Sequence, residues 1–268
     1  MKNSFCKVLF LTTFCISVLM SDAQDKSFFE KQLFILGEDT LPCRILTPQD
    51  FTAGKKYPLV IFLHGAGERG NDNEAQLTWG ADLFLDSANR ANFPAIVVFP
   101  QCPKNQRWSD YTKKINDEKA ELPVWTEGEM TRPLQLVSAF IDTLLNSGSI
   151  DKKRVYLGGL SMGGYGSFEL LWRKPNIFAA AIPICGGGNP AMIAGYRNDL
   201  PLWIFHGDKD NVIPVANSRM IFNLLKDKNK KIKYTEYPGV GHDSWKNAFM
   251  EKDLFPWLFA QRLPSKLR

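Results

Sequence analysis

The chain has 268 residues, of which 44% are hydrophobic, so it is long enough to form one large domain with a substantial core. The formal net charge of +5 is modest, and the lysines are dispersed or alternate with acidic residues, which excludes an extended nucleic-acid-binding surface. Outside the first 23 residues only Cys43, Cys102 and Cys185 remain, and at most one pair of them could form a disulfide. Their irregular spacing is typical of neither a disulfide framework nor a zinc site.

The N-terminus has the pattern of a secretory signal peptide over residues 1–23. Lys2 and Lys7 precede an apolar run at 8–20, and the small residues Ser21 and Ala23 suit cleavage before Gln24. The run is short for a membrane span, although an uncleaved anchor helix is the alternative. We therefore expect a secreted or periplasmic protein with a single domain over 24–268 and no stable membrane insertion after cleavage.

In the rest of the chain, short apolar segments of strand character alternate with amphipathic helical ones. Two extended runs within 31–47 predict a leading β-hairpin. Further strands are predicted at 57–63, 95–99, 155–157, 179–184, 202–205 and 231–237, and helices at 76–86, 134–145, 217–226 and 245–260, the last broken at Pro256. This alternation predicts an α/β fold in which helices cover both faces of a mostly parallel sheet.

The segment 155–166, VYLGGLSMGGYG, predicts a strand, a tight turn and a helix with Ser161 at the tip of the turn. Gly159 and Gly163 complete the pattern G-x-S-x-G, in which a side chain two residues before or after the serine would collide with neighbouring backbone. The N-terminus of the following helix points at this site, and its partial positive charge would stabilise a negative charge that develops there. The simpler alternative is a glycine-rich turn without a catalytic role.

A histidine and two aspartates follow Ser161 at suitable places. Acylation of a serine needs a neutral imidazole that takes the hydroxyl proton and a carboxylate that orients the imidazole. His242 lies in a loop after the strand at 231–237, and both Asp208 and Asp210 directly follow the preceding strand. Because the carboxyl ends of parallel strands meet at one edge of a sheet, we expect these side chains to lie close together.

Two other features predict structural roles. His64 and His206 each precede a glycine at the end of a strand, where a histidine commonly braces loops through hydrogen bonds to backbone. The stretch 65–70, GAGERG, matches a dinucleotide-binding loop, but polar residues follow it where that loop requires an apolar helix. We therefore expect no nicotinamide cofactor, and three scattered histidines predict no metal site.

Three motifs together resemble the α/β-hydrolase superfamily: HGAG at His64, GGLSMGG around Ser161 and HGDKDNVIP at His206. The resemblance covers about 57–242 and is strongest to secreted carboxylesterases, feruloyl esterases and dienelactone-hydrolase-like enzymes, including peptidases related to prolyl oligopeptidase. It implies a single α/β-hydrolase catalytic domain over 24–268 that needs no cofactor.

The resemblance also implies roles for individual residues. The family pattern H-G-x-x-D-x-x-V-P places the catalytic acid at Asp210 and leaves Asp208 as the alternative, with Ile213 in the place of the usual valine. The oxyanion hole is expected from the backbone N–H groups of Met162 and Ala66.

Three tryptophans near the predicted strand ends are candidates for substrate binding, namely Trp79, Trp108 and Trp125. Aromatic side chains in loops suit sugar rings or aromatic acyl groups, although they also serve to pack loops down. Trp108 matches the position of a tryptophan that lies near the substrate in related secreted esterases. The long polar segment 104–129 is therefore expected to border the pocket, with Trp108 against the substrate.

Together these features predict a secreted serine carboxylic-ester hydrolase that forms an acyl-enzyme. Its expected partners are small-molecule or polysaccharide-linked esters, in particular acetyl or feruloyl esters of polysaccharide. A serine peptidase related to prolyl oligopeptidase is the alternative enzyme, although those peptidases usually carry a large accessory domain. A non-catalytic carbohydrate-binding protein is the third possibility, against which the intact set of triad residues argues.

Overall fold

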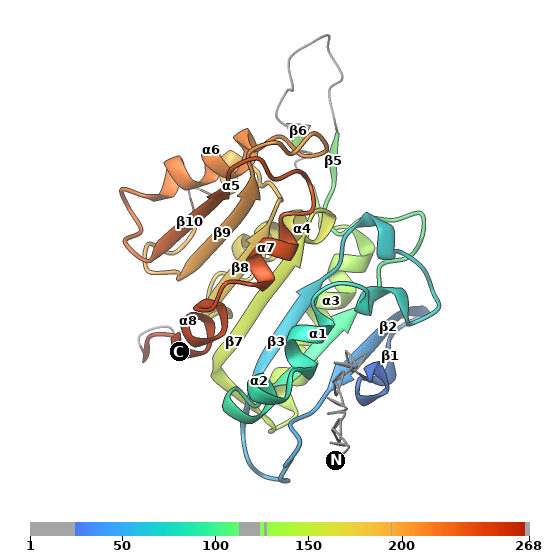
Figure 1. Cartoon of the computed structure of the whole chain (residues 1–268). Helices are drawn as coiled ribbons and strands as arrows, with labels where there is room; N and C mark the ends of the chain where they lie inside the picture. The colour runs from blue at the N-terminus through green and yellow to red at the C-terminus, as the bar shows by residue number, and fades with distance from the viewer. Residues whose placement is uncertain (1–24, 113–123, 126–127, 194, 266–268) are drawn as a thin grey trace, which may run out of the picture.

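The computed structural model describes residues 25–112, 124–125, 128–193 and 195–265. Within these ranges the main sheet has eight strands in the order β1-β2-β4-β3-β7-β8-β9-β10 (Figure 1). The strands are β1 (Glu30–Leu36), β2 (Asp39–Leu46), β3 (Tyr57–Leu63), β4 (Ile96–Pro100), β7 (Ile150–Leu160), β8 (Ala180–Ile184), β9 (Leu202–Gly207) and β10 (Ile232–Tyr237). Strand β2 pairs antiparallel with β1 and β4, and every pair from β4 to β10 is parallel. The expected hairpin and the mostly parallel sheet are confirmed.

Helices cover both faces of the sheet (Figure 1). They are α1 (Ala81–Leu85), α2 (Ser87–Asn92), α3 (Arg132–Asn146), α4 (Met162–Arg173), α5 (Pro190–Ile193), α6 (Ala216–Leu225), α7 (Trp245–Phe249) and α8 (Leu254–Ala260). Strand β3 shows why two layers are needed, because all its side chains are buried. Leu59, Ile61 and Leu63 belong to the core cluster that includes residues of α3, α4 and α6, whereas Val60 and Phe62 belong to the cluster that includes residues of α1, α7 and α8.

Two helix predictions need correction. The segment predicted as one helix at 76–86 begins with a 3₁₀ turn at Ala75–Leu77, and α1 starts only after Gly80, whose φ of 87° interrupts a right-handed helix. In the last helical region the break lies at 250–253, between α7 and α8. Pro256 lies instead in the first turn of α8, where a helix does not require the missing N–H.

The segment 104–129 contains a small strand pair beyond the carboxyl ends of the parallel strands, β5 (Tyr111–Thr112) and β6 (Val124–Trp125) (Figure 1). Both ends of the segment are fastened to helix α4. The Ser109 hydroxyl donates to Glu169, and Arg173 donates to the carbonyl of Gly128. These contacts fix where the segment leaves the domain and where it returns.

The N-terminal segment 1–23, expected as a signal peptide, lies outside the described residues. In the portion of the chain that is described, no helix combines the length and the apolar character that crossing a bilayer requires.

Candidate active site

Ser161 lies at the junction of β7 and α4, in a strained backbone conformation. Its φ of 54° and ψ of −117° are uncommon for a residue with a side chain. The Ser161 N–H donates to the carbonyl of Ile184 on β8, and the Tyr165 N–H donates to the Ser161 carbonyl. The turn is held from both sides, so the hydroxyl projects from the edge of the sheet.

The glycines on both sides of the turn are required for steric reasons. A Cβ atom at Gly159 would overlap the carbonyl of Gly163, and one at Gly163 would overlap the carbonyl of Leu63 on β3. Because the obstacles are backbone atoms, no side-chain rotation could relieve these overlaps. The close approach of strand and helix expected from the G-x-S-x-G pattern is present.

A chain of hydrogen bonds runs from Ser161 through His242 to Asp210. The Ser161 Oγ lies 2.8 Å from His242 Nε2, and His242 Nδ1 lies 2.7 Å from Asp210 Oδ2. Because the Asp210 carboxylate only accepts hydrogen bonds, His242 must carry its proton on Nδ1. The lone pair on Nε2 therefore faces the serine hydroxyl, which is the arrangement that proton abstraction requires.

The Asp210 carboxylate is surrounded by hydrogen-bond donors. Its Oδ1 accepts the N–H groups of Val212 at 2.9 Å and Ile213 at 2.8 Å, and Oδ2 lies 3.2 Å from His206 Nε2 in addition to His242. Burial raises the pKa of the carboxyl, but hydrogen bonds from His206, His242 and the Ile213 N–H outweigh it and hold the pKa well below its usual range. The carboxylate therefore stays charged while it is buried.

The rival acid is placed differently. Asp208 is half-buried, and its Oδ1 accepts the Gly239 N–H at 2.6 Å in the loop after β10. The geometry thus brings Asp210, and not Asp208, against His242.

His206 was expected only to brace backbone, and this expectation was incomplete. The ring is fully buried, and Nε2 faces both the Asp210 carboxylate and the carbonyl of Ile213, at 2.9 Å. Both are acceptors, so Nε2 carries the proton and Nδ1 accepts from the Ser218 hydroxyl at 2.7 Å. His206 therefore acts as a second donor to the carboxylate that orients His242.

His64 braces loops as expected. Its Nε2 accepts the N–H of Cys102 at 2.9 Å, and its Nδ1–H donates to the carbonyl of Gly65 at 2.6 Å. Burial lowers the pKa of this imidazole to about 4, although the bond to Gly65 acts in the opposite direction. The ring therefore stays neutral and holds the loop after β3 beside the loop after β4.

A cavity of about 500 Å³ opens beside Ser161. Ala66 and Met162 both line it, and these are the two residues expected to form an oxyanion hole. Met162 is the first residue of α4, so its N–H has no acceptor within the helix, and Ala66 is the first residue of a 3₁₀ turn after β3. The remaining lining residues are Arg69, Arg107, Tyr111, Val212 and Ile213.

Arg107 and Tyr111 belong to the segment 104–129, so the described part of this segment borders the cavity as expected. No sequence motif identifies Arg69, Arg107 or Tyr111 individually as residues of the site. All three follow strands whose carboxyl ends meet at this edge, and this position was the only available signal.

Trp108 does not contact this cavity, and the expectation that it binds substrate is corrected. Its side chain has no exposed surface, and its indole N–H donates to the carbonyl of His64 at 3.0 Å. Thr131 in turn donates to the Trp108 carbonyl at 2.9 Å. Trp108 is a core residue that holds the long segment down.

The other two tryptophans are not among the residues that line the cavity. Trp79 is half-buried and lies 5.6 Å from Trp245, ring centre to ring centre, and Trp245 lies 5.5 Å from the His242 ring. Trp245 thus lies between Trp79 and His242. The side chain of Trp125 lies outside the described residues, although its backbone pairs with Tyr111.

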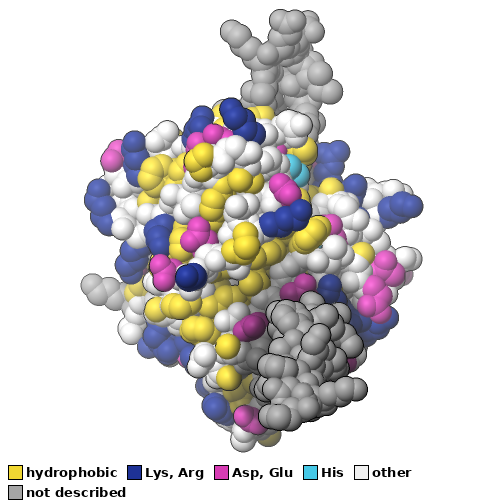
Figure 2. All heavy atoms as spheres, in the orientation of Figure 1, with side chains coloured by type: hydrophobic (Ala, Val, Ile, Leu, Met, Phe, Trp, Pro, Cys, Tyr) yellow, Lys and Arg dark blue, Asp and Glu magenta, His cyan; other side chains and the backbone are white. Residues whose placement is uncertain are grey.

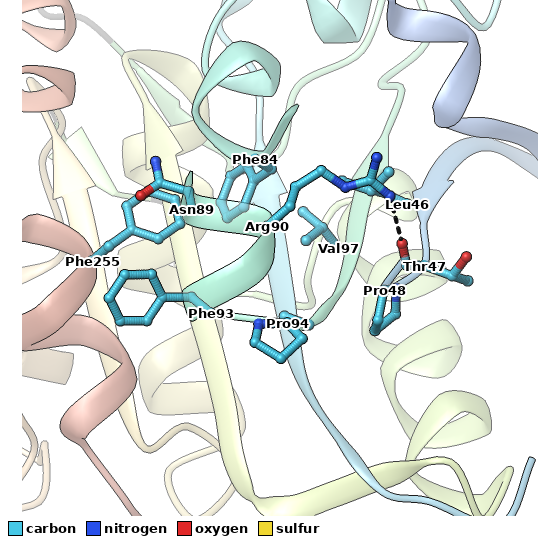
Figure 3. A pocket seen from close by; sticks show the side chains of 11 residues that line it. Leu46, Thr47, Pro48, Phe84, Asn89, Arg90, Phe93, Pro94, Val97 and Phe255 are labelled. Atoms are coloured by element: carbon cyan, nitrogen blue, oxygen red, sulfur yellow. Dashed lines mark hydrogen bonds between the residues drawn. The ribbon is translucent and has the colours of Figure 1, made fainter. Parts of the chain in front are cut away.

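A second hollow, between β2 and the helices α1, α2 and α8, is unsuited to catalysis (Figure 3). It has space for about one water molecule, at about 10 Å³, and the described residues that line it include no histidine, cysteine or carboxylate. Phe84, Phe93 and Phe255 form its walls, and Arg90 reaches across to donate to the Thr47 carbonyl at 3.2 Å.

The cysteines are Cys43, Cys102 and Cys185, and each is a buried free thiol. Possible ligand atoms of Cys185, Asp210 and His242 lie within 4.8 Å of one another. The two strongest ligands of this group are already hydrogen-bonded to each other, and burial raises the pKa of the Cys185 thiol, so the group is poorly suited to hold a metal ion.

Comparisons with known proteins show the family and the fold. The model of a phospholipase and carboxylesterase family matches residues 51–255. Among solved structures, a thermostable esterase is 38% identical with a TM-score of 0.77, over 88% of this chain and 64% of that chain. A ferulic acid esterase superposes with a TM-score of 0.64 at 15% identity, over 86% and 97% of the two chains, which shows likeness of fold alone.

Similar sequences belong to several kinds of hydrolase. The bifunctional acetylxylan esterase/xylanase of Neocallimastix patriciarum is 27% identical over 63% of this chain and 21% of that protein. A probable dipeptidyl-peptidase 5 of Aspergillus niger is 22% identical over 81% and 33%. Acyl-protein thioesterase 1 of Neurospora crassa is 26% identical over 77% and 87%. The chain thus spans about a fifth and a third of the first two relatives, and most of the third.

Proposed function

Because the chain belongs to the phospholipase/carboxylesterase family and is a serine hydrolase of the esterase type, we propose that Ser161, His242 and Asp210 form its catalytic triad. The observation that carries this proposal is the unbroken hydrogen-bond chain from Ser161 Oγ to the Asp210 carboxylate. The tautomer of His242 imposed by Asp210 leaves a lone pair on Nε2 to accept the serine proton.

The reaction then proceeds through an acyl-enzyme. Ser161 Oγ attacks the ester carbonyl carbon while His242 Nε2 takes the hydroxyl proton. The oxyanion that forms accepts hydrogen bonds from the N–H groups of Ala66 and Met162, each worth about 3 kcal/mol in the transition state. The intermediate collapses as His242 gives its proton to the departing alcohol. A water molecule, deprotonated by His242, then attacks the acyl carbon, and His242 returns this proton to Ser161 Oγ as the carboxylic acid leaves.

For the substrate we propose acyl esters of polysaccharide, acetyl or feruloyl, cleaved outside the cytoplasm. The acetylxylan esterase among the similar sequences and the ferulic acid esterase of the same fold support this assignment. The signal-peptide pattern at the N-terminus supports secretion. A mature protein that begins at Gln24, identified by mass spectrometry of the exported product, would test the cleavage.

The second candidate is a peptidase, which the similarity to a dipeptidyl-peptidase favours. Activity on 4-nitrophenyl acetate, methyl ferulate and a proline anilide, measured side by side, separates the two. An esterase cleaves the first two substrates faster than the anilide. A preference for the anilide would contradict the proposed function.

Ser161→Ala tests the triad directly. We expect kcat for ester hydrolysis to fall by about 10⁶, because removal of a triad serine leaves only binding and the oxyanion donors. Ser167→Ala is the matched control, since the Ser167 hydroxyl only donates to the Gly163 carbonyl within α4. Retention of more than about one per cent of the activity by folded Ser161→Ala would refute the assignment.

A further inference from the structure

We propose that the cavity beside Ser161 selects esters that carry a carboxylate group, which Arg69 and Arg107 bind. The inference rests on the proposed function, because it narrows the proposed esters to those that carry a carboxylate near the cleaved bond. Both arginines line this cavity together with Ser161, and none of its described lining residues is acidic.

The two arginines reach the cavity from separate loops. Arg69 is half-buried and follows the 3₁₀ turn after β3, whereas Arg107 is exposed and lies after β4, shortly before β5. The loop after β3 also supplies Ala66, an expected oxyanion donor. An anionic group bound between the arginines would therefore lie in the same cavity as Ser161, so that one small ester molecule could reach both.

Neither guanidinium has an acidic partner in the described part of the chain. Arg69 donates to the carbonyls of Ala66 at 2.9 Å and Gln106 at 3.3 Å. Arg107 donates to the carbonyl of Tyr111 at 3.1 Å and lies 5.6 Å from the centre of its ring. These neutral contacts position the two side chains but leave their charge uncompensated.

Most other arginines of the described chain, in contrast, have a carboxylate partner. Of the ten arginines that the structure describes, seven lie within 4 Å of a carboxylate, and only Arg69, Arg90 and Arg107 do not. The seven paired residues are Arg44, Arg132, Arg154, Arg173, Arg197, Arg219 and Arg262. Two of the three unpaired arginines thus face the same cavity as the reactive serine.

Glu68, the acidic residue nearest to Arg69 in sequence, forms no ion pair with Arg69 among the described residues. The Glu68 carboxyl lies against Gly65 of its own loop, with Oε2 3.0 Å from the position that a Cβ atom of Gly65 would take, and Glu68 is absent from the described lining of the cavity. On the face of the molecule seen in Figure 2, basic and acidic side chains are interspersed. A cavity whose charged described lining residues are both arginines therefore differs from the surface visible there.

The chemistry of the lining fits a carboxylate. A guanidinium presents a planar fork of N–H donors that matches the two oxygens of a carboxylate, and both arginines keep several donors unused. The N-terminus of α4, at Met162, adds a positive potential at the same cavity. The Tyr111 ring beneath Arg107 stacks on Tyr165 at 4.2 Å, which supports the position of Arg107.

Matched substrate pairs test the proposal. The first pair is the acetate esters of 4-hydroxybenzoate and 4-hydroxybenzamide, which differ by a carboxylate on the alcohol side. The second pair is the 4-nitrophenyl esters of terephthalate and of its monoamide, which differ by a carboxylate on the acyl side. For the wild type we expect a higher kcat/KM on the carboxylate member of at least one pair, with an advantage that shrinks as salt is added.

Arg69→Gln and Arg107→Gln should remove this preference, with Arg90→Gln as the control. Arg90 is also half-buried and unpaired, but it lies at the hollow of Figure 3. We expect each cavity variant to lower kcat/KM for the carboxylate ester about threefold to fivefold, and the double variant about tenfold, mainly through KM. The amide ester should stay within about twofold of the wild type, as should both esters with Arg90→Gln.

Equal losses on both members of each pair would overturn the proposal, because Arg69 and Arg107 would then only hold their loops. An unchanged preference in the double variant would overturn it as well. Binding of terephthalate, measured by calorimetry, gives a readout independent of hydrolysis and should weaken about tenfold in the double variant. If Ser161→Ala remained active while terephthalate binding depended on the arginines, the proposed function would fail and the anion site would stand.

Discussion

Replacement of Asp210 by asparagine places an amide where the structure supplies four donors. The Oδ1 position faces the N–H groups of Val212 and Ile213, and the Oδ2 position faces His242 and His206. An asparagine has one oxygen and one NH₂ group, so one of the two positions must receive a donor. The outcome depends on which neighbours can adapt.

The backbone N–H groups cannot adapt, because they have no second protonation state. An NH₂ group against them would leave two buried donors without an acceptor, at about 1–3 kcal/mol each. Imidazoles can change tautomer, so the NH₂ group should face His242, whose Nδ1 then accepts and whose Nε2 carries the proton. That Nε2 has no lone pair for Ser161, and the same error in a serine protease triad lowers kcat by about 10⁴, or about 5 kcal/mol of transition-state stabilisation.

The measurement is kcat for 4-nitrophenyl acetate, with thermal unfolding as a check that Asp210→Asn is folded. Asp208→Asn is the matched control, because the Asp208 side chain accepts one N–H, from Gly239, and an amide oxygen can do the same. The control should keep kcat within about threefold of the wild type. The reasoning is refuted if folded Asp210→Asn stays within about tenfold of the wild type, or if Asp208→Asn loses as much.

Three further predictions concern the support of the site. Trp108→Ala should lower the free energy of unfolding by about 3–5 kcal/mol in denaturant titrations, because a fully buried side chain is lost. It should reduce kcat/KM equally for small and bulky esters, whereas a loss confined to bulky esters would show that Trp108 contacts the substrate. Lowering the pH from 6.5 to about 4 should reduce the free energy of unfolding by about 3 kcal/mol through His64, because the imidazole is protonated in the unfolded chain but stays neutral when buried. In His64→Gln the free energy of unfolding should depend less on pH over this range. Gly163→Ala should not yield folded, active enzyme, because its Cβ overlaps the Leu63 carbonyl; near-normal activity would show that strand and helix can separate.

Local pattern predicted the sheet well because the physical signal is itself local. Strand β3 is buried on both faces, so every residue from Tyr57 to Leu63 is apolar and the strand is visible in the sequence. The helix at 76–86 was mispredicted, since the apolar spacing continues through Gly80 while its backbone conformation does not. Periodicity records which face is buried, not where φ changes sign.

The arrangement of Ser161, Asp210 and His242 could be anticipated because each residue follows a parallel strand. Trp108 could not, since its burial depends on a backbone carbonyl 44 residues away in sequence, at His64. The contact of His206 with Asp210 depends on how one turn folds back on itself, which composition does not record. Whether a tryptophan such as Trp108 contacts substrate or lies in the core is therefore decided by its tertiary contacts, which residue type alone does not reveal.

The fastening of the segment 104–129 has a consequence for how this enzyme can diversify. Ser109 is held by Glu169 and Gly128 by Arg173, one helical turn apart on α4, and Thr131 closes the base against Trp108. These contacts lie outside the stretch 110–127, so we expect them to persist when that stretch is exchanged. We expect inserts of other sequences between these contacts to leave Ser161 and His242 in place, because neither residue belongs to the stretch. A library built there would vary the wall that Tyr111 now supplies, and so the choice of ester, without rebuilding the hydrolase beneath it.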